Sequence, residues 1–380
     1  APAAGRGLTR GQGGRIGPLP PPAAATAGRL AAQVVRWQRR HGRHGLPWQG
    51  TRDPYRVWLS EVMLQQTQVS TVLDYYPRFL GRFPSVQVLA AAPLDDVLAL
   101  WSGLGYYSRA RHLHRCAQQV VAVHAGCFPT SSAVLATLPG VGRSTAAAIA
   151  AFCFGERAAI LDGNVKRVLT RVLGFGGDLA LAAEERRLWA IADSLLPARA
   201  VDVYTQGLMD LGATVCLARN PACALCPLAG DCVARRTGTP ERYPVKTRKL
   251  QRGRREHALL WLQHRGRWWL VQRPPRGVWA GLWTLPEFES KDALAGVAAG
   301  WAGQGRWLPA IEHALTHFDW TLHPLAWHWP ARLKTLPDLL DQADPASSRW
   351  VTPQEALALG LPALVRRFSE TRRPHPLTAA

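Results

Sequence analysis

The chain has 380 residues, of which 47% are hydrophobic, and a formal net charge of +20. This length predicts more than one domain, and the charge favours a polyanionic partner such as nucleic acid, the alternative being a basic protein with no specific partner. Seven cysteines in so long a chain do not resemble a small disulfide framework, and no apolar run reaches membrane-spanning length. We therefore expect a soluble protein in a reducing compartment.

Composition divides the chain into segments. Residues 1–28 contain no acidic and no aromatic residue, which predicts a disordered basic tail, with a transit peptide as the alternative. Residues 29–240 repeat apolar side chains with the period of a helix, including one run over 54–76, and this predicts an all-α region. Residues 242–255 carry seven Lys or Arg and no acid, as an exposed basic linker over 241–255 would.

The last third of the chain has a different pattern. Eleven of the sixteen tryptophans lie beyond residue 260, and the segments 257–263, 268–273 and 317–329 read as strands. We expect an α+β domain over 256–370, followed by a tail over 371–380. Most of these tryptophans are expected to fill the core of a sheet, although some of them stacking on bases is the alternative.

Two acidic residues are candidates for chemistry. On a helical wheel of WLSEVMLQQTQV (58–69), Glu61 lies with Gln65 and Gln68 at the edge of an apolar face, where partial burial would raise the pKa of the carboxyl. A solvated helix glutamate is the alternative. In ILDGNVKRV (160–168), Asp162 precedes a basic helix and is by default its N-cap.

The segment LPGVGRST (138–145) predicts a tight turn between a helix that ends at Leu138 and another that begins at Arg143. The amides of Gly140 and Gly142 would point outward beside the positive end of the second helix, where they suit one phosphate. This is a helix-hairpin-helix pattern, but glycine serves any tight helix connection, so a plain turn is the alternative.

Four cysteines occur close together in CLARNPACALCPLAGDC (216–232). In a protein of a reducing compartment this spacing predicts metal ligands, and both zinc and an iron–sulfur cluster remain open. Three of the four lie within ten residues, which favours one [4Fe–4S] cluster over a pair of zinc knuckles. The proposed ligands are Cys216, Cys223, Cys226 and Cys232.

The motifs taken together carry a family resemblance. LPWQ (46–49), WLSEVMLQQTQV, LWSGLGYYSRARHLH (100–114), LPGVGRST, LDGNVKRV (161–168) and the cysteine loop resemble, in order and spacing, the A/G-specific adenine DNA glycosylases of the helix-hairpin-helix superfamily. LVQRPPRGVWAGLWTLPEFE (270–289) resembles the Nudix-like C-terminal domain of that family. The resemblance implies a six-helix barrel over about 53–160, a cluster lobe from 29–52 and 161–240, and double-stranded DNA as the partner.

The function that the resemblance implies is base excision repair by a monofunctional hydrolase, which flips out adenine mispaired with 8-oxoguanine or guanine and leaves an abasic site. Glu61 would protonate adenine N7, Asp162 would stabilise the oxocarbenium ion or capture it covalently, and Asn164 would orient water or the acid. The resemblance also implies substrate contacts: wedging by Gln66 and Tyr106, an adenine pocket with Trp48 and Gln206, and lesion contacts from Thr67 and Leu104.

Ser144 distinguishes this pattern from endonuclease III, which carries a lysine nucleophile at that position of the turn. A serine hydroxyl forms no imine, so we expect Ser144 at most to touch the sugar or the cation. In the C-terminal domain, Thr316 and His317 of LTHF stand where the family inspects 8-oxoguanine. The segment SKDALAGVAAGWAG (290–303) has too few acids for a Nudix hydrolase, so we expect recognition without hydrolysis.

Three alternatives remain open: an endonuclease III-like glycosylase-lyase acting on oxidised pyrimidines, a nucleotide-pool Nudix hydrolase, and a cluster protein that only binds DNA. We expect a monomer in a bacterial cytoplasm, associated with the nucleoid; organellar and nuclear targeting are the alternatives left open.

Overall fold

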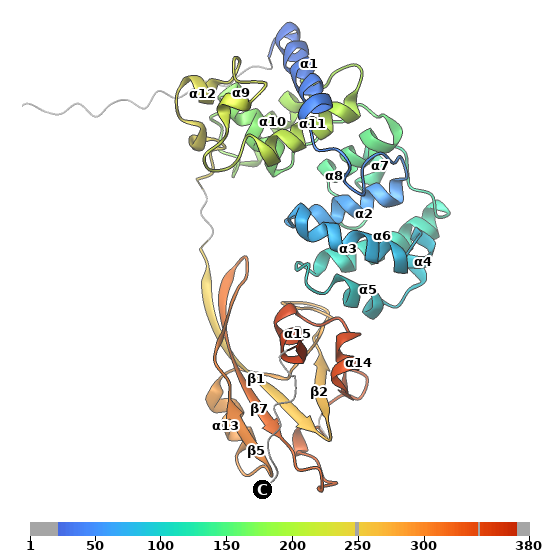
Figure 1. Ribbon diagram of the computed structural model, residues 1–380, viewed down its shortest axis with the longest axis vertical. Helices are drawn as coiled ribbons and strands as arrows, with labels where there is room; N and C mark the ends of the chain where they lie inside the picture. The colour runs from blue at the N-terminus through green and yellow to red at the C-terminus, as the bar shows by residue number, and fades with distance from the viewer. Residues whose placement is uncertain (1–21, 248–250, 341–342, 371–380) are drawn as a thin grey trace, which may run out of the picture. The chain divides into compact units, whose positions relative to one another are not determined.

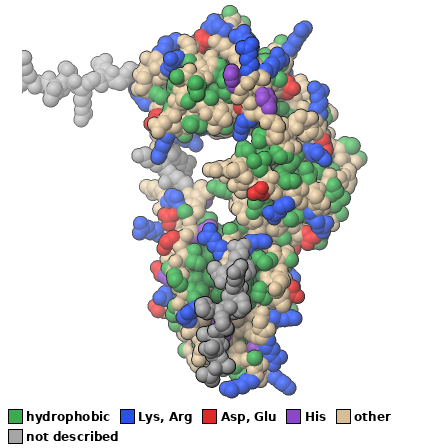
Figure 2. All heavy atoms as spheres, in the orientation of Figure 1, with side chains coloured by type: hydrophobic (Ala, Val, Ile, Leu, Met, Phe, Trp, Pro, Cys, Tyr) green, Lys and Arg blue, Asp and Glu red, His purple; other side chains and the backbone are tan. Residues whose placement is uncertain are grey.

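The computed structural model of the protein describes residues 22–247, 251–340 and 343–370 (Figure 1). The chain divides into two compact units, of which unit 1 holds residues 1–44 and 150–248 and unit 2 holds residues 45–149 and 249–380. Lys and Arg side chains are spread over the surface of both units, as the net charge of +20 requires (Figure 2). Within the described ranges, no helix is both long enough and apolar enough to cross a membrane.

Unit 1 is helical, and the first helix of the chain packs against the last long helix of this unit. The elements are α1 (Ala24–His41), the π-helix η1 (Ala150–Phe154), α9 (Gly163–Leu173), α10 (Ala182–Ser194), α11 (Val201–Thr214), the 3-10 turn η2 (Cys223–Leu225), α12 (Val233–Arg236) and the 3-10 turn η3 (Pro240–Arg242). Gly207 on α11 permits a close approach, because a Cβ there would lie 2.7 Å from Val34 Cγ1 on α1. The apolar face of α1, which includes Val34, is therefore buried in the core of this unit.

The N-terminal part of unit 2 is a helical domain with an aromatic core. Its helices are α2 (Pro54–Leu64), α3 (Val69–Arg82), α4 (Val86–Ala91), α5 (Leu94–Trp101), α6 (Ser108–His124), α7 (Ser132–Leu135) and α8 (Arg143–Ile149). Trp58 and Trp101 are fully buried, and their rings contact Phe128 and Phe79 at centroid distances of 5.2 and 6.0 Å. The first contact joins α2 to the segment after α6, and the second joins α3 to α5.

The C-terminal part of unit 2 is a mixed sheet with helices. Its elements are β1 (Gly253–His264), β2 (Arg267–Gln272), β3 (Trp283–Thr284), β4 (Glu287–Phe288), α13 (Lys291–Ala298), β5 (Gln304–Trp307), β6 (Ile311–Ala314), β7 (Phe318–His328), the 3-10 turn η4 (Asp338–Leu340), β8 (Ser348–Val351), α14 (Pro353–Leu357) and α15 (Ala363–Glu370). The central strands β1 and β7 run parallel, and β1 forms an antiparallel hairpin with β2. Residues 258–263 of β1 form a continuous buried run, which is typical of a strand covered on both faces.

The fold class expected from the sequence is confirmed: an all-α part precedes an α+β part. The strands expected over 257–263, 268–273 and 317–329 correspond to β1, β2 and β7. Most of the C-terminal tryptophans lie in or against the core of the sheet, among them Trp268, Trp269, Trp283 and Trp320.

Several boundaries differ from the expectation. The single helix expected over 54–76 is broken between Leu64 and Val69, and the helix expected to end at Leu138 ends at Leu135. Helix α1 includes residues 24–28 of the expected tail, and β1 includes residues 253–255 of the expected linker. The rest of the N-terminal tail (1–21), residues 248–250 and the C-terminal tail (371–380) lie outside the described residues.

Candidate active site

Asp162 directly precedes α9 and accepts a hydrogen bond from the backbone N–H of Val165 at 2.7 Å. The expected N-cap is therefore present. Burial raises the pKa of the Asp162 carboxyl, and donors from the backbone of Val165 and Asn164, together with the charge of Arg167, only partly offset this effect. The carboxylate is consequently held in a place where its negative charge is less favourable than in water.

Asn164 is the second residue of α9 and is oriented by Arg167. Arg167 Nη2 donates to Asn164 Oδ1 at 2.7 Å and to the carbonyl of Gly212 at 2.6 Å, while its Nε donates to the carbonyl of Cys216 at 2.7 Å. Because Oδ1 accepts this bond, the Nδ2 group of Asn164 is the side that can donate to another partner. Helix α11 approaches closely here, since a Cβ on Gly212 would lie 2.5 Å from Asn164 Cβ.

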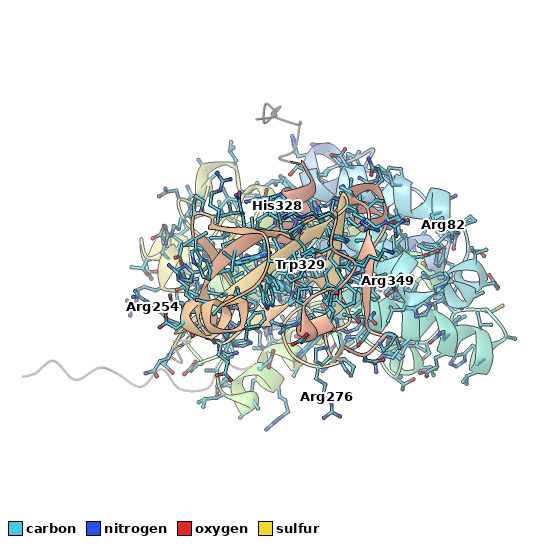
Figure 3. All side chains as sticks on the ribbon, turned by 90° about the horizontal axis from the view of Figure 1, so that it is seen from below. Arg82, Arg254, Arg276, His328, Trp329 and Arg349 are labelled. Atoms are coloured by element: carbon cyan, nitrogen blue, oxygen red, sulfur yellow. The ribbon has the colours of Figure 1, made fainter. Side chains whose placement is uncertain are left out.

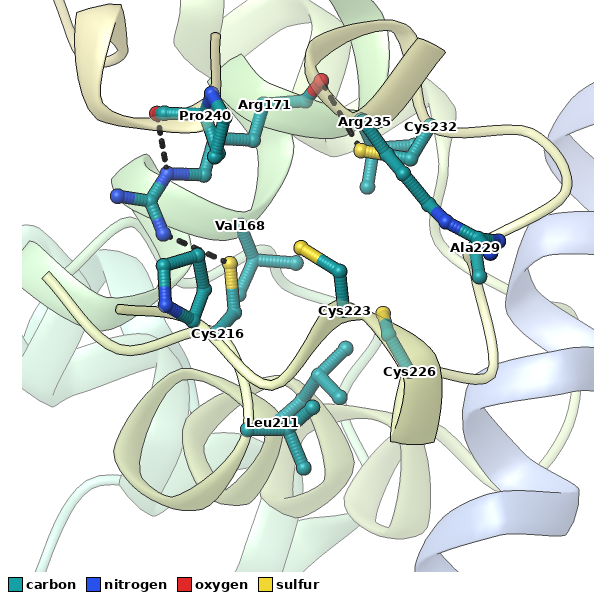
Figure 4. A pocket seen from close by; sticks show the side chains of 13 residues that line it. Val168, Arg171, Leu211, Cys216, Cys223, Cys226, Ala229, Cys232, Arg235 and Pro240 are labelled. Atoms are coloured by element: carbon teal, nitrogen blue, oxygen red, sulfur yellow. Dashed lines mark hydrogen bonds between the residues drawn. The ribbon is translucent and has the colours of Figure 1, made fainter. Parts of the chain in front are cut away.

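The four cysteines of 216–232 line one cavity, together with apolar side chains from α9 and α11 (Figure 4). Arg171 is buried beside them and donates to Cys216 Sγ at 3.4 Å and to the carbonyl groups of Leu217, Ala218 and Pro240 at 2.6, 3.0 and 2.8 Å. The loop that carries the thiols is thus fixed to α9 by one guanidinium.

The cavity that the cysteines line fits the cluster that the sequence favours. In the part of the chain that is described, no three or more His, Cys, Asp or Glu side chains are placed to hold a single metal ion. A zinc site needs its four ligands around one point, whereas a [4Fe–4S] cluster binds each thiolate through a different iron and needs a wider cavity. The four cysteines around a shared apolar cavity fit the cluster.

Glu61 is half-buried on α2, where the neighbouring Trp58, Val62 and Met63 are buried. The expected apolar face is thus present. The polar edge that Glu61 was expected to share with Gln65 and Gln68 is absent, because α2 ends at Leu64 and both glutamines lie beyond the helix.

Two turns of the helical domain hold non-glycine residues in the left-handed conformation. Gln66 has φ 58° in the turn between α2 and α3, and Tyr106 has φ 48° in the turn before α6. Both side chains are exposed, Tyr106 by 47%. Thr67 and Leu104 lie in the same two turns, so the structure brings together the four residues expected to wedge the duplex and contact the lesion. Left-handed backbone is costly at such residues and is concentrated at functional sites.

The helix-hairpin-helix turn has the expected geometry at its glycines. Gly140 has φ 76°, and a Cβ there would lie 2.6 Å from His112 Cβ, whereas the space beside Gly142 is open. In the described chain, neither glycine amide donates a backbone hydrogen bond. Ser144 is half-buried on α8, and its neighbour Thr145 accepts a hydrogen bond from Gln65 Nε2 at 3.3 Å, which ties the turn after α2 to this motif.

The remaining candidates are distributed over both units. Trp48 is 8% exposed and packs edge-on against Tyr76 in unit 2. Gln206 lies on α11 of unit 1, and its Nε2 donates to the buried Asp210 at 2.9 Å, which leaves Gln206 Oε1 as the acceptor. Thr316 and His317 are exposed at the tip of the β6–β7 hairpin.

The structure therefore groups the candidates within each unit. Unit 1 brings Asp162 and Asn164 to the start of α9, next to the cysteine loop, and unit 2 holds Glu61, both turns and the hairpin motif. The pairing of Glu61 with Asp162, which belong to different units, stays a prediction.

Sequence reasoning missed the arginines that hold these segments, above all Arg109 on α6. This residue is 8% exposed, and the sequence did contain a signal for it. Arg109 has the helical spacing of the buried Leu113, Cys116 and Val120, so a charged residue stands within the apolar stripe of α6.

The raised pKa of Asp162 makes a prediction about stability. In the unfolded chain the carboxyl ionises with its ordinary pKa of 3.8, while the fold disfavours the ion, so the cost to stability grows as pH rises from 3.8 towards the folded pKa and is fully present above it. Asp162→Asn keeps a capping oxygen and should raise the melting temperature at pH 7 by about 1 to 4 °C. The difference should vanish below pH 3.8. Calorimetry at several pH values measures it, and a variant that is less stable at pH 7 would contradict the argument.

Comparison with known proteins finds a match for three parts of the chain. Family models match residues 59–192 as an HhH-GPD superfamily base excision DNA repair protein, residues 216–232 as the iron-sulfur binding domain of endonuclease III, and residues 257–371 as a NUDIX domain. In fold, the chain is similar to a thermostable thymine-DNA glycosylase, with a TM-score of 0.51 and 26% identity over 56% of this chain and 98% of that one. The [4Fe–4S] cofactor expected from the sequence is thereby confirmed.

Two relatives carry the same name. The adenine DNA glycosylase of Buchnera aphidicola subsp. Acyrthosiphon pisum is 39% identical over 259 residues, which are 68% of this chain and 74% of that protein. The human adenine DNA glycosylase is 34% identical over 365 residues, which are 80% of this chain and 65% of that protein. Together with the helix-hairpin-helix core, the cysteine-lined cavity and the Nudix-like domain, these matches show that the chain belongs to the adenine DNA glycosylase family.

Proposed function

We propose that the protein removes adenine that stands opposite 8-oxoguanine or guanine in duplex DNA. As a member of its family it is an adenine DNA glycosylase, a hydrolase of the N-glycosidic bond that acts in base excision repair. The mispair, the roles of single residues and the monomeric state are the proposed parts. The observation that carries the proposed base extrusion is the pair of exposed, left-handed residues Gln66 and Tyr106.

These two residues suit base extrusion. A base inside a duplex is out of reach for hydrolysis, so the enzyme must unstack it and fill the gap. An amide and an aromatic ring held outward on tight turns can enter the stack without first reordering their backbone, which lowers the entropy cost of binding. Thr67 and Leu104 flank the wedging residues and would contact the base left opposite the gap.

Two carboxyl groups would act in different steps of the reaction. Glu61 would donate a proton to adenine N7, because adenine leaves poorly as an anion. Asp162 would then stabilise the oxocarbenium ion or capture it before water attacks. The desolvation that raises the pKa of Asp162 in the free protein supports this role, since a carboxylate with little solvation interacts more strongly with a developing cation. Asn164 would orient water or the acid through Nδ2, because its Oδ1 is engaged by Arg167.

The adenine pocket would use Trp48 and Gln206. Gln206 Oε1 is the acceptor that remains after Nε2 donates to Asp210, and the exocyclic amine of adenine is a donor. The glycine amides of the hairpin turn would bind a phosphate, since Gly142 leaves the approach open.

The cluster is held by Cys216, Cys223, Cys226 and Cys232 in this proposal, and it supplies structural order to the loop between α11 and α12. The proposed domains are a helical barrel, a cluster lobe assembled from both ends of the helical region, and a lesion-recognition domain. At the tip of the β6–β7 hairpin, Thr316 and His317 would inspect 8-oxoguanine. Helix α13 carries one acid, Asp292, which is too few to hold the magnesium of a Nudix hydrolase.

The proposed roles of the acids predict the outcome of a single-turnover assay on a duplex with one A·8-oxoguanine pair. Glu61→Gln and Asp162→Asn should each keep most DNA binding and lose turnover by about 100-fold or more, since each removes a group used in the transition state. Asp74→Asn, an exposed change on α3, is the control and should act like the unaltered protein. Retained turnover in both acid variants would reject the assignment.

Ser144 predicts that the product is an intact strand with an abasic site. Sodium borohydride should trap no covalent complex on the A·8-oxoguanine duplex or on a thymine-glycol duplex, because the turn offers no amine. Lys166 is engaged in an ion pair with Glu185, which limits its access to the product sugar. Strand cleavage without alkali on the thymine-glycol duplex would instead favour the glycosylase-lyase.

The close packing of Gly212 against Asn164 predicts that Gly212→Ala disturbs the start of α9. The added Cβ would meet the Asn164 Cβ at 2.5 Å and its Cα at 3.0 Å, so backbone must move. We expect a loss of stability of about 1 to 3 kcal/mol and of turnover by about 10- to 100-fold. Gly28→Ala on the exposed face of α1 is the matched control, since nothing lies within 4 Å of its Cβ. Unchanged turnover in Gly212→Ala would contradict the proposed place of Asn164.

A further inference from the structure

One buried side chain connects the two left-handed turns of unit 2. Arg109, in the first turn of α6, directs its guanidinium between the turn after α2 and the turn before α6. Its Nη1 donates to the carbonyl groups of Val62, Met63 and Gln65 at 2.9, 2.8 and 2.6 Å, and its Nη2 donates to Thr67 Oγ1 and to the carbonyl groups of Leu104 and Gly105 at 3.0, 3.2 and 3.1 Å. One guanidinium therefore donates hydrogen bonds to both turns.

The charge of Arg109 is stabilised without an acid. In the described part of the chain no carboxylate pairs with it, and the guanidinium carbon lies 5.2 Å from the ring centroid of Trp101 and 5.7 Å from that of Tyr106. Burial lowers the pKa of Arg109 to about 10, so the group is still a cation at neutral pH. Carbonyl oxygens and aromatic faces thus replace the usual counterion.

The acceptors of Arg109 lie on both sides of the two wedging residues. Gln65 and Thr67 flank Gln66, while Leu104 and Gly105 precede Tyr106, whose own carbonyl accepts from the Arg109 backbone N–H at 2.9 Å. A non-glycine residue stays left-handed only where its surroundings compensate for the cost. At Gln66 and Tyr106, that compensation comes from the same guanidinium.

We propose that Arg109 is the positioning residue of the strand-opening wedge, holding Gln66 and Tyr106 together in the shape in which they enter the duplex. The inference rests on the proposed wedging role of these two residues and extends it to a residue that touches neither base nor sugar. It explains why an arginine lies in the apolar stripe of α6, where a leucine would pack without a desolvation cost.

The proposal requires the geometry of arginine as well as its charge. A guanidinium presents donors in a flat, fixed fork, and here the four N–H groups of Nη1 and Nη2 are shared among six acceptors on two turns, whereas an ammonium group is a point charge with three donors. Arg109→Lys should therefore keep the cation and release at least one turn. Arg82→Lys is the matched control, because Arg82 lies on the surface of the same unit and makes a single ion pair with Asp96 at 2.8 Å (Figure 3).

The first measurement is amide hydrogen exchange of the full-length protein without DNA. In Arg109→Lys, peptides that cover 62–67 and 103–107 should exchange about tenfold faster, while the rest of the helical domain and the visible absorbance of the cluster stay unchanged. Unchanged exchange in both turns would overturn the proposal. Faster exchange across the whole domain, or failure of both Arg109→Lys and Arg109→Gln to fold, would overturn it as well, because the residue would then be a general structural one.

The second measurement separates strand opening from chemistry. On the A·8-oxoguanine duplex the single-turnover rate of Arg109→Lys should fall about 10- to 100-fold, and the fluorescence rise of 2-aminopurine placed at the target position should slow in parallel. On a duplex whose target adenine is flanked by mismatches, the rate should recover to within about threefold of the unaltered protein, because the stack is already open. An equal loss on both duplexes would overturn the proposal. Absence of turnover by the unaltered protein would instead refute the proposed function.

Discussion

Backbone carbonyl groups that have no hydrogen-bond partner within a helix or strand need other donors. In this protein buried arginines supply these donors beside the candidate site residues. Arg109 serves two turns of unit 2, while Arg167 and Arg171 serve the loop that follows α11 in unit 1. In the described ranges no carboxylate forms an ion pair with any of the three. Because a guanidinium holds several acceptors in one plane, a single side chain can fix segments that have no regular secondary structure. Such segments carry the candidate functional residues of this protein.

In unit 1 this constraint connects the metal loop to the proposed catalytic residues. Arg171 contacts Cys216 Sγ, and Arg167 contacts the Cys216 carbonyl and Asn164 Oδ1. These bonds position the first turn of α9 partly through the cysteine loop. A cluster bound by this loop would therefore help to position Asn164 by ordering the loop, and this effect needs no change in the oxidation state of the cluster. Gly212 reinforces the arrangement, since only hydrogen fits between α11 and Asn164.

Local patterns in the sequence predicted several of the elements and favoured the cofactor that the comparison supports. The alternation of β7, the helical period of α9 and the spacing of the cysteines each depend on residues close in the chain, and each prediction was confirmed. The break after Leu64 was missed because its cause is not local: the carbonyl groups that would continue α2 are bonded instead to Arg109, more than 40 residues away. The edge argument for Gln65 and Gln68 failed for the same reason. The family resemblance supplied the wedging residues, but no periodicity showed that both would be left-handed.

Two features of the free protein cost stability, and the reaction gives each a reason. The left-handed backbone at Gln66 and Tyr106 is unfavourable in solution, yet in the proposed function it would shape the side chains before they meet the duplex. The desolvation that raises the pKa of Asp162 is unfavourable for its ion, yet the same low polarity strengthens the attraction to a positive sugar. Catalysis requires interactions that are stronger in the transition state than before it. If the free protein stabilised these groups fully, their interaction energy would not increase when the base leaves. The unfavourable terms in the free protein therefore allow the transition state to be stabilised more than the ground state.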